Sequence, residues 1–240
     1  MRVIRVYQDT ILATNNNFDL DELSCHHLLK VLRIKSNQEL VLFNGDGSAY
    51  PAIINNISKN NVNITIINKI NKNNELNKHI HLAQALCKGN KMEYVIQKAV
   101  ELGVSTITPI ISEYSDIKLN AEKISKKLQH WQNIIVTACA QCGRNIIPII
   151  HTPIHFNIFC NNQKNNSVKL ILDPKAAQHI KNTGNINNTN VIALIGPEGG
   201  FSAAEITIAQ QNNFASINIG PRVLRTETAG LAVVSMLQIL

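Results

Sequence analysis

The 240-residue chain has few cysteines, few aromatic residues and few charged residues. Its five cysteines are odd in number and irregularly spaced, which disfavours a disulfide framework and fits a reducing compartment. The N-terminal segment lacks the apolar stretch of a signal peptide, and no apolar run approaches the ~20 residues of a membrane span. Hydrophobic residues nevertheless make up 45% of the chain, enough for a sizeable core. We therefore expect a cytoplasmic protein of one or two globular domains.

Basic residues outnumber acidic ones. The 23 lysines and arginines against 16 aspartates and glutamates give a formal net charge of +7. That balance favours a polyanionic partner, most simply a nucleic acid. A basic protein without such a partner remains the alternative.

The first 70 residues carry the pattern of short β-strands. Asn44-Gly45-Asp46-Gly47 is a strong hairpin turn, and one helix is expected from about Asp21 to Leu32. Short strands at this spacing predict a small barrel. The predicted strands are Val3–Tyr7, Leu40–Phe43, Tyr50–Ile57 and Val62–Ile67, and a linker rich in Asn and Lys follows them.

From His79 onward, strand and helix patterns alternate, which predicts a parallel sheet covered on both faces. The predicted strands are 80–85, 106–110, 146–150, 168–172, 191–195 and 216–219, and the predicted helices are 91–102, 121–140, 203–211 and 226–240. The last helix is apolar on nearly every face, so we expect it in the core or in a dimer interface.

Two loops rich in glycine and proline give the strongest functional signal. They are Ile195–Ser202 (IGPEGGFS) and Ile219–Ala229 (IGPRVLRTETA), and each lies between an apolar run and a helical pattern. Glycine lets a backbone approach a ligand, and ligands of open α/β sheets bind at the carboxyl ends of the strands. Neither loop is a P-loop or a dinucleotide-binding fingerprint. We expect the loops side by side, forming a cleft lined by backbone amides and carbonyls.

The two loops together resemble the RsmE family, the SPOUT-class methyltransferases that modify a uridine of 16S ribosomal RNA at N3. The resemblance extends over the whole chain. It includes three further motifs: HLLKVLR at 27–33 with Phe43-Asn44-Gly45, KGNKME at 88–93 with QKAVELG at 97–103, and QCGR at 141–144.

The resemblance implies an α/β SPOUT fold with a deep trefoil knot and an N-terminal PUA-like barrel. Its domains would be a PUA-like RNA-binding barrel at 1–70, a linker at 71–78 and a methyltransferase domain at 79–240. Knots are very rare, and periodicity alone would not reveal one.

The resemblance also implies that the knot binds S-adenosylmethionine through three loops. The cofactor-binding residues would be Leu172, Asp173, Pro174, Ile195, Gly196, Pro197, Gly199, Gly200, Ile219, Gly220, Val223, Leu224 and Thr228. No metal is expected.

The expected reaction is an attack of uridine N3 on the cofactor's methyl group. Because N3 is protonated at neutral pH, the site needs a cation near the uracil carbonyls and possibly a base. Arg225 and Arg144 are the candidate cations. Glu227 is a candidate base, but it could equally orient Arg225 or face a helix N-terminus.

The expected partner is 16S ribosomal RNA within the small subunit, bound by a homodimer. The candidate RNA-binding residues are His27, Lys30, Arg33, Lys88, Lys91, Arg144 and Arg222, with surface residues of no special role as the alternative for each lysine. For the histidine pair His26-His27, next to Leu28 and Leu29 on a helix, a packed role is favoured over RNA contact.

The chain departs from the family pattern at two places. Ala140 precedes the QCGR motif where the family often has Glu, and Glu113-Tyr114-Ser115 replaces the usual Glu-Arg-Ser. Any RNA contact of that missing arginine is therefore absent or replaced.

One pattern resembles a set of zinc ligands: Cys139-x-x-Cys142 followed by His151-x-x-x-His155. The gap between the cysteines and the histidines is too short for a C2H2 finger, and the cysteines lie at the end of a helical pattern. No strand leads directly into the Cys-x-x-Cys, which disfavours a redox pair.

Two rival functions stay open. One is a non-catalytic RNA-binding protein, which would not need the two glycine loops. The other is a SPOUT methyltransferase acting on ribose or on transfer RNA, which the Arg222–Ala229 run and the N-terminal barrel disfavour.

Overall fold

The computed structural model describes residues 3–71, 73–115, 120–163, 166–184, 186 and 189–240. The chain divides into two compact units. The barrel unit comprises Met1–Glu75 and Cys139–Ile147, and the α/β unit comprises Leu76–Ala138 and Pro148–Leu240. The segment 139–147 thus packs with the first unit, although the sequence patterns placed it in the second domain. Lys72 of the predicted linker lies outside the described residues.

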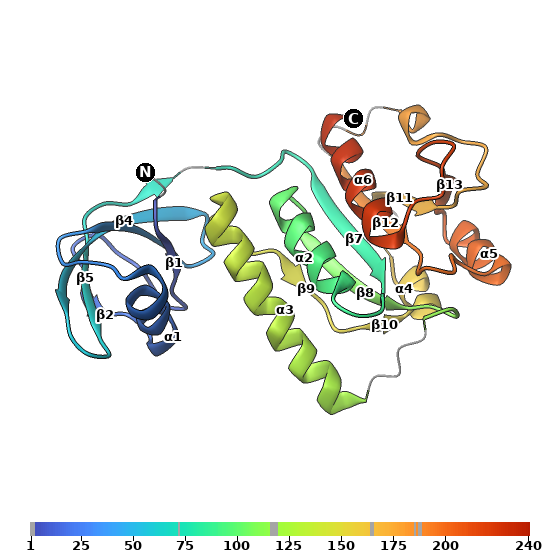
Figure 1. Cartoon of the computed structure of the whole chain (residues 1–240). Helices are drawn as coiled ribbons and strands as arrows, with labels where there is room; N and C mark the ends of the chain where they lie inside the picture. The colour runs from blue at the N-terminus through green and yellow to red at the C-terminus, as the bar shows by residue number, and fades with distance from the viewer. Residues whose placement is uncertain (1–2, 72, 116–119, 164–165, 185, 187–188) are drawn as a thin grey trace. The chain divides into compact units, whose positions relative to one another are not determined.

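The barrel unit is built around the strand order β1-β3-β4-β5-β2, with β6 pairing β4 (Figure 1). Strand β1 is parallel to β3, and the other pairs are antiparallel. The predicted hairpin turn joins β3 to β4, with Gly45 and Gly47 at φ values of +93° and +91°. The strands are β1 (Arg5–Tyr7), β2 (Asn17–Asp19), β3 (Glu39–Phe43), β4 (Ser48–Ile57), β5 (Val62–Ile66) and β6 (Ile70–Asn71). Alternating apolar residues fill the inside, which confirms the predicted PUA-like barrel.

The single helix expected in this unit is divided into two kinds of helix. Asp21 caps α1 (Glu22–His26), its carboxylate accepting a hydrogen bond from the backbone N–H of Ser24 at 2.9 Å. The chain continues as a π-helix, η1 (His27–Leu32), and ends at Arg33 in the left-handed region with φ +50°. Hydrophobic periodicity does not reveal the wider π turns, which are frequent at functional sites.

The α/β unit contains a parallel sheet in the order β10-β8-β7-β12-β11-β13, with β9 also pairing β8. Its strands are β7 (His79–Ala85), β8 (Thr106–Ile111), β9 (Ile149–Ile150), β10 (Ile154–His155), β11 (Ser167–Leu172), β12 (Asn190–Ile195) and β13 (Ala215–Ile217). This arrangement confirms the predicted α/β fold with a parallel sheet.

Helices cover both faces of this sheet (Figure 1). Helix α6 packs on β7, β12 and α2, while α4 and α5 pack on each other and on the opposite face, against Ala83 and Leu194. The helices are α2 (Lys91–Glu101), α3 (Ala121–Cys142), α4 (Phe156–Asn161), α5 (Ala203–Gln211) and α6 (Thr226–Ile239), with a 3-10 helix, η2 (Ile180–Asn182). Among the described residues, no helix has the length and apolar character to cross a membrane.

The sequence missed the shortest elements. Strands β2, β6 and β10, helix α4 and η2 have two to six residues each, too few to show a period. The predicted strand 146–150 is reduced to β9, because its first half belongs to the barrel unit.

Candidate functional site

Three loops leave the sheet of the α/β unit at its carboxyl edge. They follow β11, β12 and β13, which are mutually parallel. Strand β11 lies between β12 and β13, so the two glycine loops flank the Leu172–Pro174 loop and do not follow neighbouring strands. The intervening β11 was not predictable, because periodicity does not give strand order, but the two glycine loops are in contact, since Thr226 of the second reaches Gly196 of the first. All three loops still meet at one edge.

The glycine loop after β12 is a tight, capped turn. The backbone N–H of Gly200 donates to the carbonyl of Pro197 at 2.9 Å, and Gly200 has φ +74°. A Cβ at Gly196 would lie 3.2 Å from the backbone of Gly200, so the turn closes on this glycine. Ser202 then caps α5 in a capping box with Glu205.

The loop after β13 is open where a ligand would approach. Gly220 has φ +134°, and a Cβ placed on it or on Gly200 would meet nothing within 4 Å. Pro221, Arg222 and Arg225 are exposed, and Val223 has 82% of its surface exposed. The two glycines border free space at the strand ends, which fits a nucleoside-bearing cofactor held by backbone groups.

A chain of hydrogen bonds connects the two glycine loops. The Thr226 hydroxyl, at the start of α6, donates to the carbonyl of Gly196 at 2.5 Å. The Gln84 side chain, at the end of β7, donates from Nε2 to that hydroxyl at 2.9 Å. Sequence reasoning missed Gln84, whose partner is 142 residues away.

An ion cluster lies at the same edge. Lys91 Nζ is 2.8 Å from Glu198 Oε1 and 3.7 Å from Glu227 Oε2. Lys91, predicted to bind RNA, therefore joins a carboxylate of each glycine loop. Burial opposes ionisation of Glu198, but the hydrogen bond and charge of Lys91 together with backbone hydrogen bonds outweigh it and lower the pKa of that carboxyl.

Cys87 is buried beside this cluster. Burial, with smaller effects from Glu198 and Glu227, raises the pKa of its thiol to about 12. Burial and the raised pKa both disfavour Cys87 as a nucleophile.

Arg144 belongs to the barrel unit and has 4% of its surface exposed. Its Nε donates to Glu75 Oε1 at 3.0 Å, and its other guanidinium contact is to Glu75 Oε2. Its carbonyl also accepts a hydrogen bond from Arg5 at 3.2 Å. The structure therefore differs from the expectation that Arg144 faces the RNA or the uracil.

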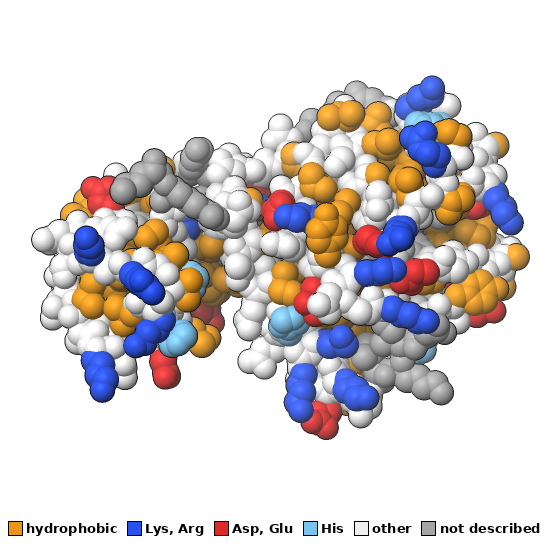
Figure 2. Space-filling model, in the orientation of Figure 1, with side chains coloured by type: hydrophobic (Ala, Val, Ile, Leu, Met, Phe, Trp, Pro, Cys, Tyr) orange, Lys and Arg blue, Asp and Glu red, His pale blue; other side chains and the backbone are white. Residues whose placement is uncertain are grey.

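The other predicted RNA-binding residues are exposed. His27, Lys30 and Arg33 project from η1 and its end, and Lys88 and Arg222 are exposed in the α/β unit. Figure 2 shows basic and acidic side chains interspersed on the viewed face of the α/β unit. That face has no single basic patch among the described residues, so phosphate contacts there would come from individual basic residues.

The cysteines and histidines of the zinc-like pattern do not converge. Cys139 is buried in the barrel unit, and burial raises the pKa of its thiol to about 12. Within the part of the chain that the structure describes, no three His, Cys, Asp or Glu side chains are placed to hold a metal ion.

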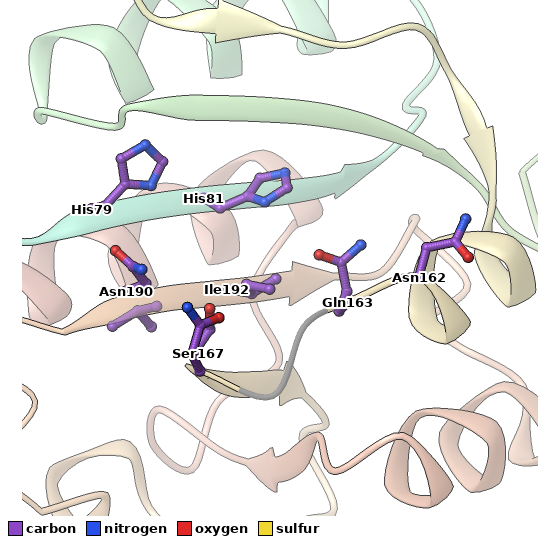
Figure 3. Close-up of a pocket in the computed structure, with 9 residues that line it drawn as sticks. His79, His81, Asn162, Gln163, Ser167, Asn190 and Ile192 are labelled. Carbon is purple, nitrogen blue, oxygen red and sulfur yellow. The ribbon is translucent and has the colours of Figure 1, made fainter.

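A polar pocket of about 410 Å³ lies at the opposite edge of the sheet (Figure 3). His79 and His81 project from β7 toward it, and Asn190 and Ile192 line it from β12. These positions are near the amino ends of the strands, away from the glycine loops. The pocket is therefore separate from the candidate cofactor site.

Two family models match the chain. The model of the RNA methyltransferase domain matches residues 74–238, and that of the RNA methyltransferase PUA domain matches residues 25–67. The ribosomal RNA small subunit methyltransferase E of Buchnera aphidicola subsp. Schizaphis graminum is 40% identical over 238 residues, covering 99% of this chain and 96% of that protein.

Solved structures are similar over the same length. One is a Legionella pneumophila protein described as a methyltransferase, in complex with the cofactor S-adenosylmethionine. It is 40% identical with a TM-score of 0.95, covering 100% of this chain and 98% of that one. The Neisseria gonorrhoeae ribosomal RNA small subunit methyltransferase E, bound to S-adenosylmethionine, is 31% identical with a TM-score of 0.93, covering 99% and 98%. This chain therefore belongs to the ribosomal RNA small subunit methyltransferase E family of RNA methyltransferases.

Proposed function

We propose that this chain transfers the methyl group of S-adenosylmethionine to N3 of a uridine in 16S ribosomal RNA. The observation that carries the proposal is the open space beside Gly200 and Gly220, where three strand-end loops meet. The names of the relatives and the cofactor in two similar structures support the same substrate and donor. The N3 position comes from the resemblance of the two loops to the family.

The three loops bind the cofactor in this proposal. Backbone groups of 196–200 and 219–224 hold the adenosine, and the loop at Leu172–Pro174 lies between them. When bound, the cofactor supplies an electrophilic methyl group. The deep trefoil knot that the resemblance implies is part of the proposal.

Arg225 stabilises the negative charge that develops on the uracil as N3 loses its proton. It is exposed at the start of α6, directly before Thr226, so its guanidinium can meet an entering base. Glu227 either accepts the N3 proton or orients Arg225, and Lys91 restrains its carboxylate. A Glu227→Gln variant separates these roles, because loss of a base removes the acidic limb of the pH–rate profile.

Phosphate contacts come from both units. The exposed residues His27, Lys30 and Arg33 supply them in the barrel unit, and Lys88 and Arg222 supply them in the α/β unit. Arg144 is reassigned from RNA contact to holding the segment 143–145 against Glu75.

We also propose a cytoplasmic homodimer that acts on the small subunit. Helix α6 buries Val233 and Leu237 within its own unit but leaves 85% of Ile239 exposed. The apolar character of α6 is thus partly used by the core, and the remaining surface is available to a second copy. Light scattering at micromolar concentration should give twice the chain mass.

Calorimetry with S-adenosylmethionine, followed by nucleoside mass spectrometry of ribosomal RNA from a deletion strain, tests the function. We expect cofactor binding and loss of one N3-methyluridine. RNA binding without cofactor binding would instead support the non-catalytic alternative. Loss of a ribose methyl group or of a transfer RNA modification would support the other rival.

A further inference from the structure

We propose that Gln84 and Thr226 are positioning residues for the cofactor loop, by which we mean the glycine loop at 196–200 after β12. They fix it through a directed hydrogen-bond chain, an inference that rests on the proposed function. The chain runs from Gln84 Nε2 to the Thr226 hydroxyl at 2.9 Å, and from that hydroxyl to the Gly196 carbonyl at 2.5 Å. It joins β7, α6 and the loop after β12.

The direction of this chain is determined by its acceptor. The Gly196 carbonyl can only accept, and a threonine hydroxyl has a single hydrogen to donate. That hydrogen is used on Gly196, so the group that Gln84 presents to Thr226 must be its NH2. The amide orientation therefore follows from the chemistry of the contact.

The same orientation leaves the other end of the amide without a donor. Gln84 is fully buried, and Gln84 Oε1 has no hydrogen-bond partner among the described residues. This oxygen lies against α6, since a Cβ on Gly230 would be 2.5 Å away from it. A buried carbonyl oxygen without a hydrogen-bond donor lowers the stability of the fold. A methionine of similar length has no such oxygen and would not carry this cost in stability. Glutamine adds two hydrogen bonds at this position, from Nε2 to the Thr226 hydroxyl at 2.9 Å and to the Ala85 carbonyl at 3.4 Å, and the shorter one leads to the glycine loop.

That bond controls the first peptide of the cofactor loop. Holding the Gly196 carbonyl fixes the plane of the Gly196–Pro197 peptide, and the ring of Pro197 fixes the next φ angle. The loop thus leaves β12 in one direction and reaches Gly200 in the conformation that borders the open space. Without the hydroxyl, the peptide plane can rotate, and cofactor binding must then order it.

The test compares cofactor affinity with thermal stability. Thr226→Val and Gln84→Met should each weaken S-adenosylmethionine binding about tenfold in calorimetry, the equivalent of one lost hydrogen bond. The double variant should be about as weak as either single variant, because both changes break the same chain. Thr226→Ser keeps the hydroxyl and should bind within about threefold of wild type.

Thr108→Val is a matched control. Thr108 is also buried, and its hydroxyl also makes a 2.8 Å hydrogen bond, to His81, but it lies on β8 away from the glycine loops. This variant should lower Tm and leave cofactor affinity unchanged. If Thr226→Val and Gln84→Met lower Tm as Thr108→Val does, yet bind the cofactor like wild type, the positioning role is overturned.

Two outcomes separate this inference from the proposed function. A wild-type protein that does not bind S-adenosylmethionine contradicts the function, whereas additive losses in the double variant contradict only the chain. Should Thr226→Val fail to fold, Thr226→Ser decides. A tenfold loss of affinity in a folded Thr226→Ser protein would overturn the inference.

Discussion

Arg144 and Arg225 both stand in family-like motifs, yet the structure places them in opposite environments. Arg144 is 4% exposed and ion-paired with Glu75 within the barrel unit. Arg225 is exposed in the second glycine loop of the α/β unit and directly precedes α6. A buried, paired guanidinium holds segments of the protein together, whereas an exposed one at a ligand edge can meet a substrate.

The comparison shows what a motif leaves undetermined. The QCGR run and the RVLR run both look suited to bind an anion. Only the fold reveals that Glu75, 69 residues before Arg144 in the sequence, already supplies a carboxylate to it. Breaking each arginine's contacts should therefore give different kinds of defect.

The largest effect is expected from Arg144→Ala, on stability. Removal of the guanidinium leaves the half-buried carboxylate of Glu75 without its cation and should lower the free energy of unfolding by about 3 kcal/mol. Urea denaturation measures this loss, while cofactor affinity of the folded variant should not change.

A double variant sharpens the result. Arg144→Ala combined with Glu75→Ala should be less destabilised than Arg144→Ala alone, because no unpaired carboxylate remains. Full stability of Arg144→Ala, together with a reduced salt dependence of RNA binding, would restore the RNA-facing role that the sequence suggested.

Arg225→Ala should have the next largest effect, on turnover. Loss of a cation that stabilises the uracil anion should lower kcat by roughly 10²-fold, or about 2.7 kcal/mol. Because Arg225 is exposed, Tm should stay near the wild-type value. Methyl transfer to small-subunit particles measures kcat, and wild-type turnover would remove Arg225 from the catalytic site.

Much of the architecture was predictable, because a long helix or strand repeats its hydrophobic period several times. The β-hairpin at Asn44–Gly47 and the strand–helix alternation after His79 follow from turn chemistry and hydrophobic pattern. The two glycine loops were recognisable because glycine lets the backbone approach a ligand, and ligands of open α/β sheets bind at the strand ends. In contrast, two-residue strands such as β6 carry no period.

The contacts within the site were not predictable, since they join residues far apart in the sequence. Gln84 looks like any strand residue until the fold brings it to Thr226. Lys91 looks like a surface lysine in the sequence, and only the fold places it beside Glu198 of the loop after β12 and Glu227 of the first turn of α6. The position of β11 between β12 and β13 likewise depends on tertiary pairing.

His81 contrasts with Arg144, because it is a half-buried basic side chain whose burial favours the neutral form. Burial, with smaller effects from His151 and His79, lowers the pKa of His81 to about 4. Between pH 6.5 and 4 the unfolded chain binds a proton that the folded chain does not, so stability falls as the pH falls through this window. The loss due to His81 between pH 6.5 and 5 should be roughly 1.5 kcal/mol.

The His81→Gln variant provides the measurement. The difference between its urea midpoint and that of wild type should narrow as the pH is lowered from 6.5 to 5. Parallel pH curves for wild type and His81→Gln would contradict a lowered pKa of His81 in the folded protein.

The smallest effect is expected from Lys30→Ala, whose side chain is exposed on η1 in the barrel unit. If Lys30 contacts a phosphate, RNA affinity should fall a few-fold at any sequence, and the magnitude of the salt slope should fall by about 1. Unlike Arg225→Ala, this variant should keep kcat at saturating RNA, because a phosphate contact positions the substrate without touching the reacting base. Lys59→Ala, at another exposed position of the same unit, should change neither the RNA affinity nor the salt slope. Equal salt slopes for wild type and Lys30→Ala would show that η1 lies outside the RNA footprint, and the exposed cations of the α/β unit would then carry the phosphate contacts alone.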